Sequence, residues 1–164
     1  MRAAPIVAFF HGQPEIAASE ALKSAVITHA HPEGVAGAVA TAVGAALARQ
    51  EAQPAEFLEQ VAHFVEESDV RDGISLAKQI SREEFDRAVR ELGTGWNVSA
   101  QDTVPFCLWC AAHHLDNYEE ALWTTIAGGG DRDTTCAIVG GIAAVSAGAV
   151  PVSYTHLRAH ETSE

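Results

Sequence analysis

The residues from Gly128 to Pro151 have the types and spacing of a cation-binding segment. Gly128, Gly129 and Gly130 allow positive φ angles and let the backbone come close to a ligand. Asp131 is then the expected N-cap of a helix, with Asp133 and Thr134 in its first turn. Two carboxylates and a hydroxyl at i, i+2 and i+3 form half of a site for a hard cation such as Mg²⁺ or Mn²⁺. The same acids would also stabilise a helix by capping and by the macrodipole without any ligand.

Two small-residue helices and a capped helix must position this segment. Asn117 and Glu120 predict a helix start, and that helix ends at Gly128 and delivers the glycine turn. The range 138–150 spaces Gly140, Ala144 and Gly148 four apart, and 33–49 is similarly rich in glycine and alanine. We predict that both small-residue helices lie in the middle of a bundle, where close backbone approach replaces large side chains.

The remaining segments are predicted to form helices that support the site. Pro14 opens a helix in which apolar or small residues keep a helical spacing, namely Ile16, Ala17, Leu22, Ala25 and Val26. Further helices are predicted from Pro54, from a cap at Asp69 through Lys78, and from a capping box at 81–84 to Gly93. The range 96–103 is a predicted loop, and Pro105 restarts a helix.

Two histidines, His29 and His31, lie at a helix exit, because His31 precedes Pro32 and the residue before proline avoids the α region. Each could be an ordinary capping residue that suits the helix dipole. A His-x-His pair also resembles a motif of the metal-dependent amidohydrolases. In such an enzyme His29 and His31 would both bind zinc. That pair normally ends a strand, and the residues before His29 have a helical pattern, so we rank this alternative second.

The cysteine pair Cys107 and Cys110 resembles a redox or zinc motif, with His113 and His114 close behind. The pair has no preceding strand or turn glycine, and at i, i+3 both thiols share one face of an apolar helix. We therefore interpret them as core residues.

Composition indicates one soluble, helical, cytoplasmic domain. The chain has 164 residues, 48% of them hydrophobic, and three cysteines, which suit a reducing compartment. The apolar range 3–10 is too short to span a bilayer and makes no convincing secretory leader. A net charge of −12 argues against nucleic acid or an anionic membrane as a partner. An anionic ligand would need divalent cations to bridge it to carboxylates.

Three segments in order resemble the ADP-ribosylglycohydrolase family: residues 1–6 (MRAAPI), residues 28–32 (THAHP), and Asp131-Arg132-Asp133-Thr134 leading into 137–142. The resemblance implies an all-α, orthogonal multi-helix bundle that hydrolyses an ADP-ribosyl bond at a centre of two Mg²⁺ or Mn²⁺ ions. It implies that Asp131, Asp133 and Thr134 are metal ligands. It also implies that His29 and the backbone of Gly128, Gly129 and Gly130 approach ADP-ribose. Arg132 departs from the family's commonest residue at that position, which is Thr.

The family's other metal ligands, in a Thr-Asp-Asp-Thr segment, and an acidic residue implicated in catalysis have no counterpart here. We therefore interpret 1–151 as the C-terminal portion of one such domain, incomplete at its N-terminus, without turnover by itself and with its catalytic residue unassigned. Its partner would be ADP-ribose or an ADP-ribosylated substrate, in an unknown oligomeric state. A non-catalytic ADP-ribose-binding or crystallin-like member of the same fold is the alternative.

The range 152–164 has no helical or strand period, and 152–162 resembles a translated sequencing adapter. We interpret it as an unstructured, artefactual tail and exclude His156 and His160 as ligands.

Overall fold

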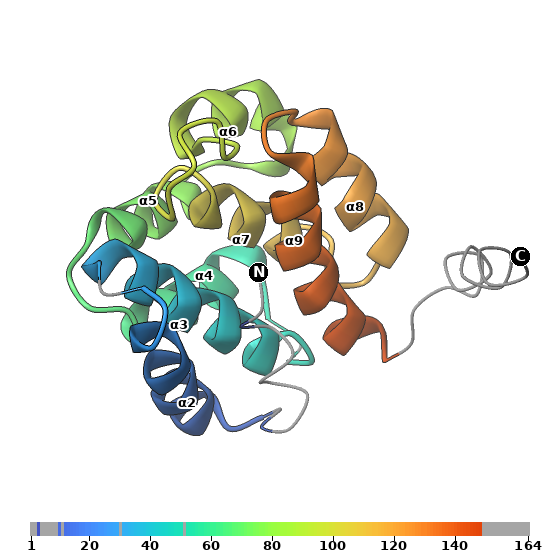
Figure 1. Cartoon of the computed structure of the whole chain (residues 1–164). Coiled ribbons are helices and arrows are strands. Elements are labelled where there is room, and N and C mark those ends of the chain that lie inside the picture. The colour runs from blue at the N-terminus through green and yellow to red at the C-terminus, as the bar shows by residue number, and fades with distance from the viewer. Residues whose placement is uncertain (1–2, 4–9, 11, 30, 51, 149–164) are drawn as a thin grey trace, which may run out of the picture.

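The computed structural model describes residues 3, 10, 12–29, 31–50 and 52–148, and the described residues form helices without a strand. The helices are α2 (Pro14–Val26), α3 (Pro32–Leu47), α4 (Pro54–His63), α5 (Asp69–Ala77), α6 (Phe85–Leu92), α7 (Val104–Ala112), α8 (Tyr118–Ala127) and α9 (Arg132–Ala147), with a 3₁₀ turn, η1 (Arg82–Glu84), before α6. Figure 1 shows the helices running in several different directions, with α8 beside α9. The predicted all-α fold is therefore confirmed. In the described part of the chain, no helix has the length and apolarity needed to cross a membrane.

Helices α3 and α7 form the centre of the bundle. Helix α3 contacts α2, α4, α5, α7 and α9, and 11 of its 16 residues are buried. Glycines allow this close packing: a Cβ at Gly44 would lie 2.8 Å from Leu108 Cδ2, and one at Gly37 would lie 2.9 Å from Ala100 Cβ. The prediction that the small-residue helix after Pro32 lies in the core is confirmed, and its lack of large side chains is what lets neighbours approach.

Helix α7 supplies the largest buried side chains. Trp109 is fully buried and donates a hydrogen bond from Nε1 to the Ile80 carbonyl at 2.9 Å, and Phe106 stacks against it. Cys107 and Cys110 are also fully buried. Burial raises the pKa of Cys110 to about 12, so its thiol stays protonated and unreactive at neutral pH. The cysteine pair is therefore part of the core, as predicted.

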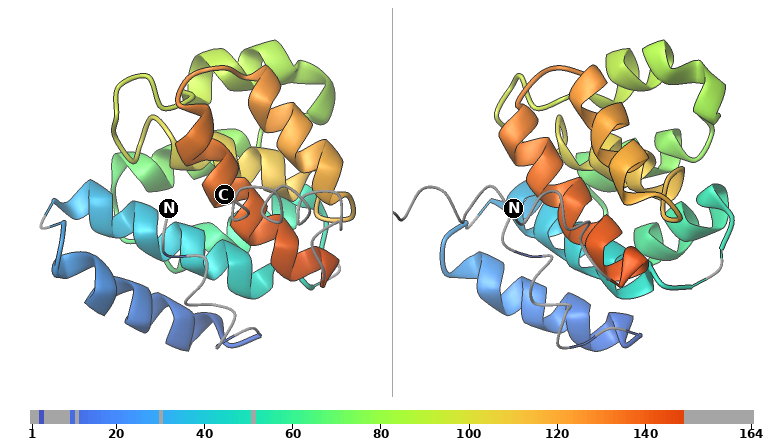
Figure 2. Two further views of the ribbon diagram at one scale, coloured as in Figure 1. Left: turned by 45° about the vertical axis from the view of Figure 1, so that its right-hand side comes forward. Right: turned by 90° about the vertical axis from the view of Figure 1, so that its right-hand side faces the viewer.

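Helix α2 buries only the small residues of its predicted apolar set. Its buried residues are Ala17, Ala21 and Ala25, whereas Ile16, Leu22 and Val26 are exposed. The alanines and the larger residues both repeat at helical spacing. The alanines pack on the glycine- and alanine-rich surface of α3 because small side chains let the two helices approach more closely. Among the described helices α2 contacts α3 alone, and Figure 2 shows the two lying side by side.

Helix α9 is less central than predicted. Its buried face includes Ile138, Val139 and Ile142, but Ala144 is half-buried and Gly148 is exposed. Gly148 ends the helix with φ 68°, a left-handed conformation that favours glycine. The predicted range of this helix, 138–150, extends two residues beyond Gly148, and residues 149 and 150 lie outside the described part of the chain.

The ends of the other helices follow the predicted caps, with one correction. Asn117 Oδ1 accepts from the Glu120 N–H at 3.1 Å, and Glu84 Oε2 accepts from the Ser81 N–H at 3.0 Å. The cap of α5 is Ser68, whose Oγ accepts from the Arg71 N–H, and Asp69 is the first helical residue. Serine and aspartate are equally good caps, so the sequence could not decide between neighbours.

A second group binds the start of α5 from another helix. The carboxylate of Glu33, in the first turn of α3, accepts from the Asp69 N–H at 3.1 Å and the Val70 N–H at 3.0 Å. A negative charge is favourable at this position, because free N–H groups and the helix dipole meet there. Glu33 thus fixes the start of α3 to the start of α5.

Two histidines near the end of α7 predict a loss of stability in mild acid. Burial lowers the pKa of His113 and of His114 below the ordinary value of 6.5, so the folded protein favours their neutral forms. The free energy of unfolding is therefore highest above pH 6.5, where both histidines are neutral in the folded and the unfolded chain. It falls as the pH drops below 6.5 toward the lower pKa values of the folded state, because the unfolded chain then binds more protons. We expect the urea midpoint to fall between pH about 7.5 and about 5.5.

The H113Q/H114Q double variant should lose much of this pH dependence, whereas H63Q, which changes an exposed histidine, should keep it. An unchanged slope in the double variant would contradict the assignment.

Candidate functional site

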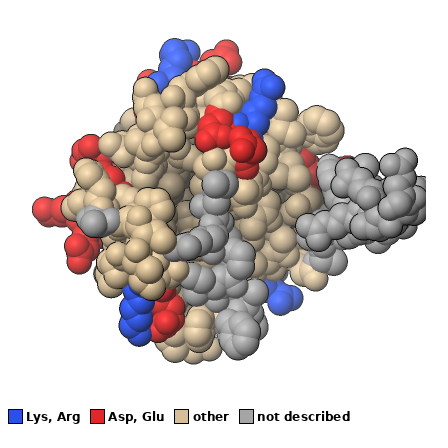
Figure 3. All heavy atoms as spheres, in the orientation of Figure 1, with Lys and Arg blue, Asp and Glu red and all other residues tan. Residues whose placement is uncertain are grey.

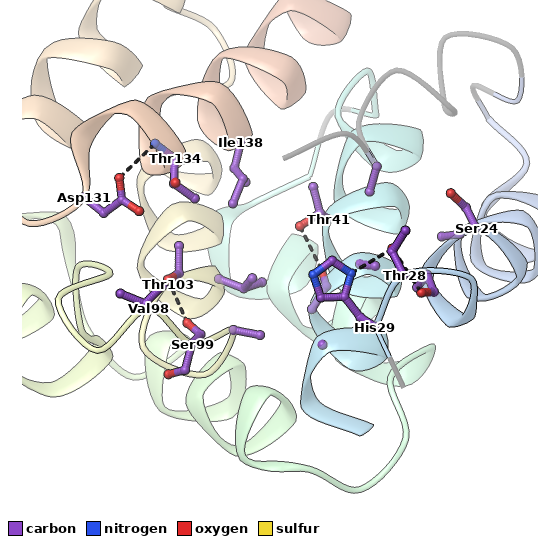
Figure 4. Close-up of a pocket in the computed structure, with 18 residues that line it drawn as sticks. Ser24, Thr28, His29, Thr41, Val98, Ser99, Thr103, Asp131, Thr134 and Ile138 are labelled. Atoms are coloured by element: carbon purple, nitrogen blue, oxygen red, sulfur yellow. Dashed lines mark hydrogen bonds between the residues drawn. The ribbon is translucent and has the colours of Figure 1, made fainter. Parts of the chain in front are cut away.

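A pocket of about 530 Å³ lies between the α2–α3 pair, the loop after α6 and the start of α9. Figure 4 shows Asp131 and Thr134 on one side of it and His29 and Thr28 on the other, with Thr41 beside His29. The pocket therefore brings together two segments, around residues 29 and 131, that are far apart in the sequence. Its volume lies within the range of small-molecule sites in proteins.

Asp131 is the N-cap of α9, as predicted. Its Oδ1 accepts from the Thr134 N–H at 3.3 Å. A hydrogen bond with the Thr134 side chain, followed by one with the Asp133 carboxyl and one with the Thr134 N–H, lowers the pKa of Asp131 below its usual value. Asp131 is therefore a carboxylate at neutral pH, which is the form that binds a cation.

Asp133 lies beside Asp131 but outside the pocket lining, and its side chain is exposed. In Figure 3 acidic atoms gather beside a basic side chain near the start of α9. The three residues predicted as metal ligands thus share one helix end, with Asp131 and Thr134 facing the pocket.

The glycine turn holds this helix end in place. A Cβ at Gly130, where φ is 65°, would lie 2.0 Å from the Thr94 carbonyl oxygen, and a Cβ at Gly128 would lie 2.5 Å from Phe106 Cζ. Gly129 also has positive φ, 74°, but no atom lies within 4 Å of its Cβ position. None of the three lines the pocket. In this structure Gly128 and Gly130 are needed for packing, and the predicted backbone approach to a ligand stays a prediction.

The loop from Gly93 to Thr103 supports Asp131 from the other side. The Asp131 N–H donates to the Thr94 carbonyl at 3.0 Å, and a Cβ at Gly95 would lie 2.8 Å from Asp131 Cβ. Asp102 holds the loop, because its Oδ2 accepts from the Asn97 N–H at 2.7 Å and its carbonyl accepts from the Gly95 N–H at 2.8 Å. The loop therefore fixes the backbone on which Asp131 stands.

His29 reaches the pocket from the corner between α2 and α3. Its Nδ1 is 2.8 Å from Thr28 Oγ1, and its Cβ lies 3.3 Å from the position of a Cβ at Gly34. His31 instead caps α3, with Nδ1 accepting from the Glu33 N–H at 3.3 Å. The His-x-His metallohydrolase alternative predicts a strand before the pair, whereas the structure has helix α2 there, so that predicted strand is wrong.

The remaining walls include residues that the sequence pattern did not single out as site residues. Gly37, Ala38 and Thr41 of α3 face the pocket, as do Ser99 and Thr103 of the loop. Thr41 Oγ1 already donates to the Gly37 carbonyl at 2.8 Å. The small-residue stripe of α3 was a usable signal, because a helix without large side chains can leave space as well as fill it.

The donor chemistry at the start of α9 fits a hard cation in part. Mg²⁺ and Mn²⁺ prefer oxygen ligands, and Mg²⁺ is often bound by one or two carboxylates, with the other positions taken by water and substrate oxygens. Asp131, Asp133 and Thr134 offer two carboxylates and a hydroxyl on one helix turn. Within the described residues no third acid joins them. This donor set suits one side of a metal centre.

Arg132, between the two acids, is directed toward α8. Its Nε donates to the Ile126 carbonyl at 3.2 Å, and the residue does not line the pocket. A cation bonded to a carbonyl near the end of α8 is favourably placed. The arginine therefore leaves the pocket side of the helix end to the acids.

Comparison with known proteins defines the class to which this fold and site belong. The ADP-ribosylglycohydrolase family matches residues 1–161, and the chain is a member of that family. The matched range includes 152–161, which we interpret as a tail and which lies outside the described residues.

One relative is an uncharacterized protein of Archaeoglobus fulgidus, 33% identical over 153 residues. The alignment covers 92% of this chain and 49% of that protein, so the chain spans about half the length of the relative.

Proposed function

We propose that the protein hydrolyses the glycosidic bond that joins ADP-ribose to an acceptor, and that this chain supplies one side of the ADP-ribose site. Membership of the ADP-ribosylglycohydrolase family supports a glycohydrolase-like enzyme. The observation that carries the proposal is that His29, Asp131 and Thr134 line one pocket of about 530 Å³. These are the residues in which the sequence resembles the family at two separate places.

Charge supports a divalent cation as part of the proposal. ADP-ribose carries a diphosphate, and the chain carries a net charge of −12. Direct approach of the anion to Asp131 would be repulsive, whereas Mg²⁺ or Mn²⁺ held by Asp131, Asp133 and Thr134 would reverse the local charge. Such a cation supplies electrostatic stabilisation to sugar and phosphate oxygens when it is bound.

The chain's own residues would orient the ligand and exclude water. Asp131 is held ionised by its hydrogen bonds, and Thr94 and Gly95 fix its backbone. His29, on the opposite side, offers a ring that can stack or hydrogen-bond with a ligand. Glycosidic hydrolysis proceeds through an oxocarbenium-like transition state, so the position of the ligand relative to the acceptor matters. We propose that the group that transfers the proton comes from the remainder of the protein, and that this chain alone binds without turnover.

The test is the melting of the chain, followed by circular dichroism, with Mg²⁺ or Mn²⁺ and ADP-ribose. We expect a rise in Tm with cation and ADP-ribose together, because a ligand at about 100 times its Kd stabilises a fold by about 2.7 kcal/mol. EDTA should remove the rise, and ribose 5-phosphate, which lacks the diphosphate, should give less of it. A melt that does not respond to the pair of ligands would refute the proposed site.

A non-catalytic ADP-ribose-binding protein is the second candidate. It is favoured by one observation: among the described residues that line the pocket, Asp131 is the acidic one, and no second acid faces it to act as proton donor or base. Both candidates predict ADP-ribose binding. They differ in whether a protein extended to the length of its relative releases ADP-ribose from a modified substrate.

A further inference from the structure

Two large apolar side chains stand exposed in the loop that forms the rim of the pocket. Trp96 is 77% exposed and Val98 is 88% exposed, and Val98 is also among the residues that line the pocket. Scattered apolar residues on a surface need no explanation. A tryptophan and a valine two residues apart at the mouth of a candidate site are a different case, because tryptophan is prominent among residues that dominate binding surfaces.

The loop holds this pair in a defined conformation. Val98 has φ 51°, which is rare for a β-branched residue and costs conformational energy. Hydrogen bonds maintain it: the Val98 N–H donates to the Gly95 carbonyl at 3.1 Å, and the Asn97 N–H donates to Asp102 Oδ2 at 2.7 Å. A loop backbone that is already ordered loses little entropy when a partner binds.

The same loop contacts the acid end of the pocket. Thr94 accepts from the Asp131 N–H, and Gly95 packs against Asp131 Cβ. Trp96 follows Gly95 directly in the chain and is exposed, and Val98 lines the same pocket as Asp131. If the reacting end of a ligand lies near Asp131, whatever is attached to that end must leave the pocket beside this loop.

We propose that Trp96 and Val98 bind the polypeptide that carries the ADP-ribosyl group, through an apolar side chain next to the modified residue. This inference rests on the proposed function. It adds a partner, a modified polypeptide with an apolar neighbour, and it assigns Trp96 to contact with that polypeptide and not with ADP-ribose itself. Trp123, on α8, is also exposed, at 59%, but lies outside the loop from Gly93 to Thr103, which makes it a matched control.

The test is a double-mutant cycle on binding by the chain in the presence of Mg²⁺. The ligands are free ADP-ribose and two peptide pairs, ADP-ribosylated at a single serine or a single arginine, with either leucine or glycine beside the modified residue. In the unaltered chain we expect the leucine peptide to bind roughly 10-fold more tightly than its glycine counterpart. In W96A this preference should vanish, whereas Kd for free ADP-ribose should stay the same, and W123A should keep both.

Each other outcome overturns the inference. If W96A weakens free ADP-ribose as much as the peptides, Trp96 belongs to the ADP-ribose site. If W96A and V98A leave the preference for leucine intact, or if the unaltered chain shows no such preference, Trp96 and Val98 do not bind the polypeptide. Failure of the unaltered chain to bind free ADP-ribose would instead refute the proposed function, so the two failures are distinguishable.

Discussion

D131N should abolish the cation-dependent binding of ADP-ribose while leaving the fold intact. Asparagine caps a helix about as well as aspartate, so the start of α9 should keep its hydrogen bond to Thr134 and its stability within a few tenths of a kcal/mol. The charge, however, is lost. Changing a group that only supports a metal ligand costs 10- to 100-fold in affinity, so we expect removal of a direct ligand to cost at least about 100-fold.

Isothermal titration with Mg²⁺ and ADP-ribose, beside a urea melt, would separate the two effects. D131A should lose binding and, in addition, about 1 kcal/mol of stability, because alanine cannot cap. E119Q is the matched control, since Glu119 is an exposed acid in the first turn of another helix, α8. If D131N bound the cation and ADP-ribose as the unaltered chain does, the assignment of Asp131 would be wrong.

G130A should destabilise the protein far more than G129A. Both substitutions place an alanine at positive φ, which costs about 1–2 kcal/mol. Only at Gly130 does the new Cβ meet backbone, at 2.0 Å from the Thr94 carbonyl oxygen. Either the turn or the loop must move, and the hydrogen bond from the Asp131 N–H to Thr94 is then lost. Overpacking of this kind adds about 1–3 kcal/mol.

We therefore expect a loss of roughly 3 kcal/mol for G130A and roughly 1 kcal/mol for G129A in urea unfolding. Cation-dependent ADP-ribose binding should fall in G130A, because Asp131 shifts with its backbone, and should persist in G129A. Equal losses of stability in the two variants would show that the contact with Thr94 contributes nothing.

The starts and ends of the helices could be predicted from sequence because they depend on local chemistry. Pro14, Asn117 and Asp131 begin helices through backbone restriction or through side-chain capping of the next turn. These effects act within three or four residues, so a single sequence contains them. The correction from Asp69 to Ser68 arose where two good caps stand side by side.

The packing of α2 and the walls of the pocket could not be predicted in this way. The buried face of α2 consists of Ala17, Ala21 and Ala25, and its larger apolar residues are exposed. This choice depends on the surface of α3, which is a property of another segment of the chain. The approach of His29 to the pocket that Asp131 lines depends likewise on how α3 and α9 cross. The family resemblance linked those two residues, and composition and periodicity did not.

The single attachment of α2 has a consequence for the kinetics of ligand exchange. Among the described helices α2 packs on α3 alone, yet Ala21, Ser24 and Ala25 line the pocket. The free energy for detaching α2 is therefore set by one interface, and it should lie below the free energy of global unfolding. Amide hydrogens of α2 should exchange with solvent sooner than those of α7. A ligand bound between α2 and α9 should slow amide hydrogen exchange in α2. Dissociation of that ligand would then require only the detachment of α2.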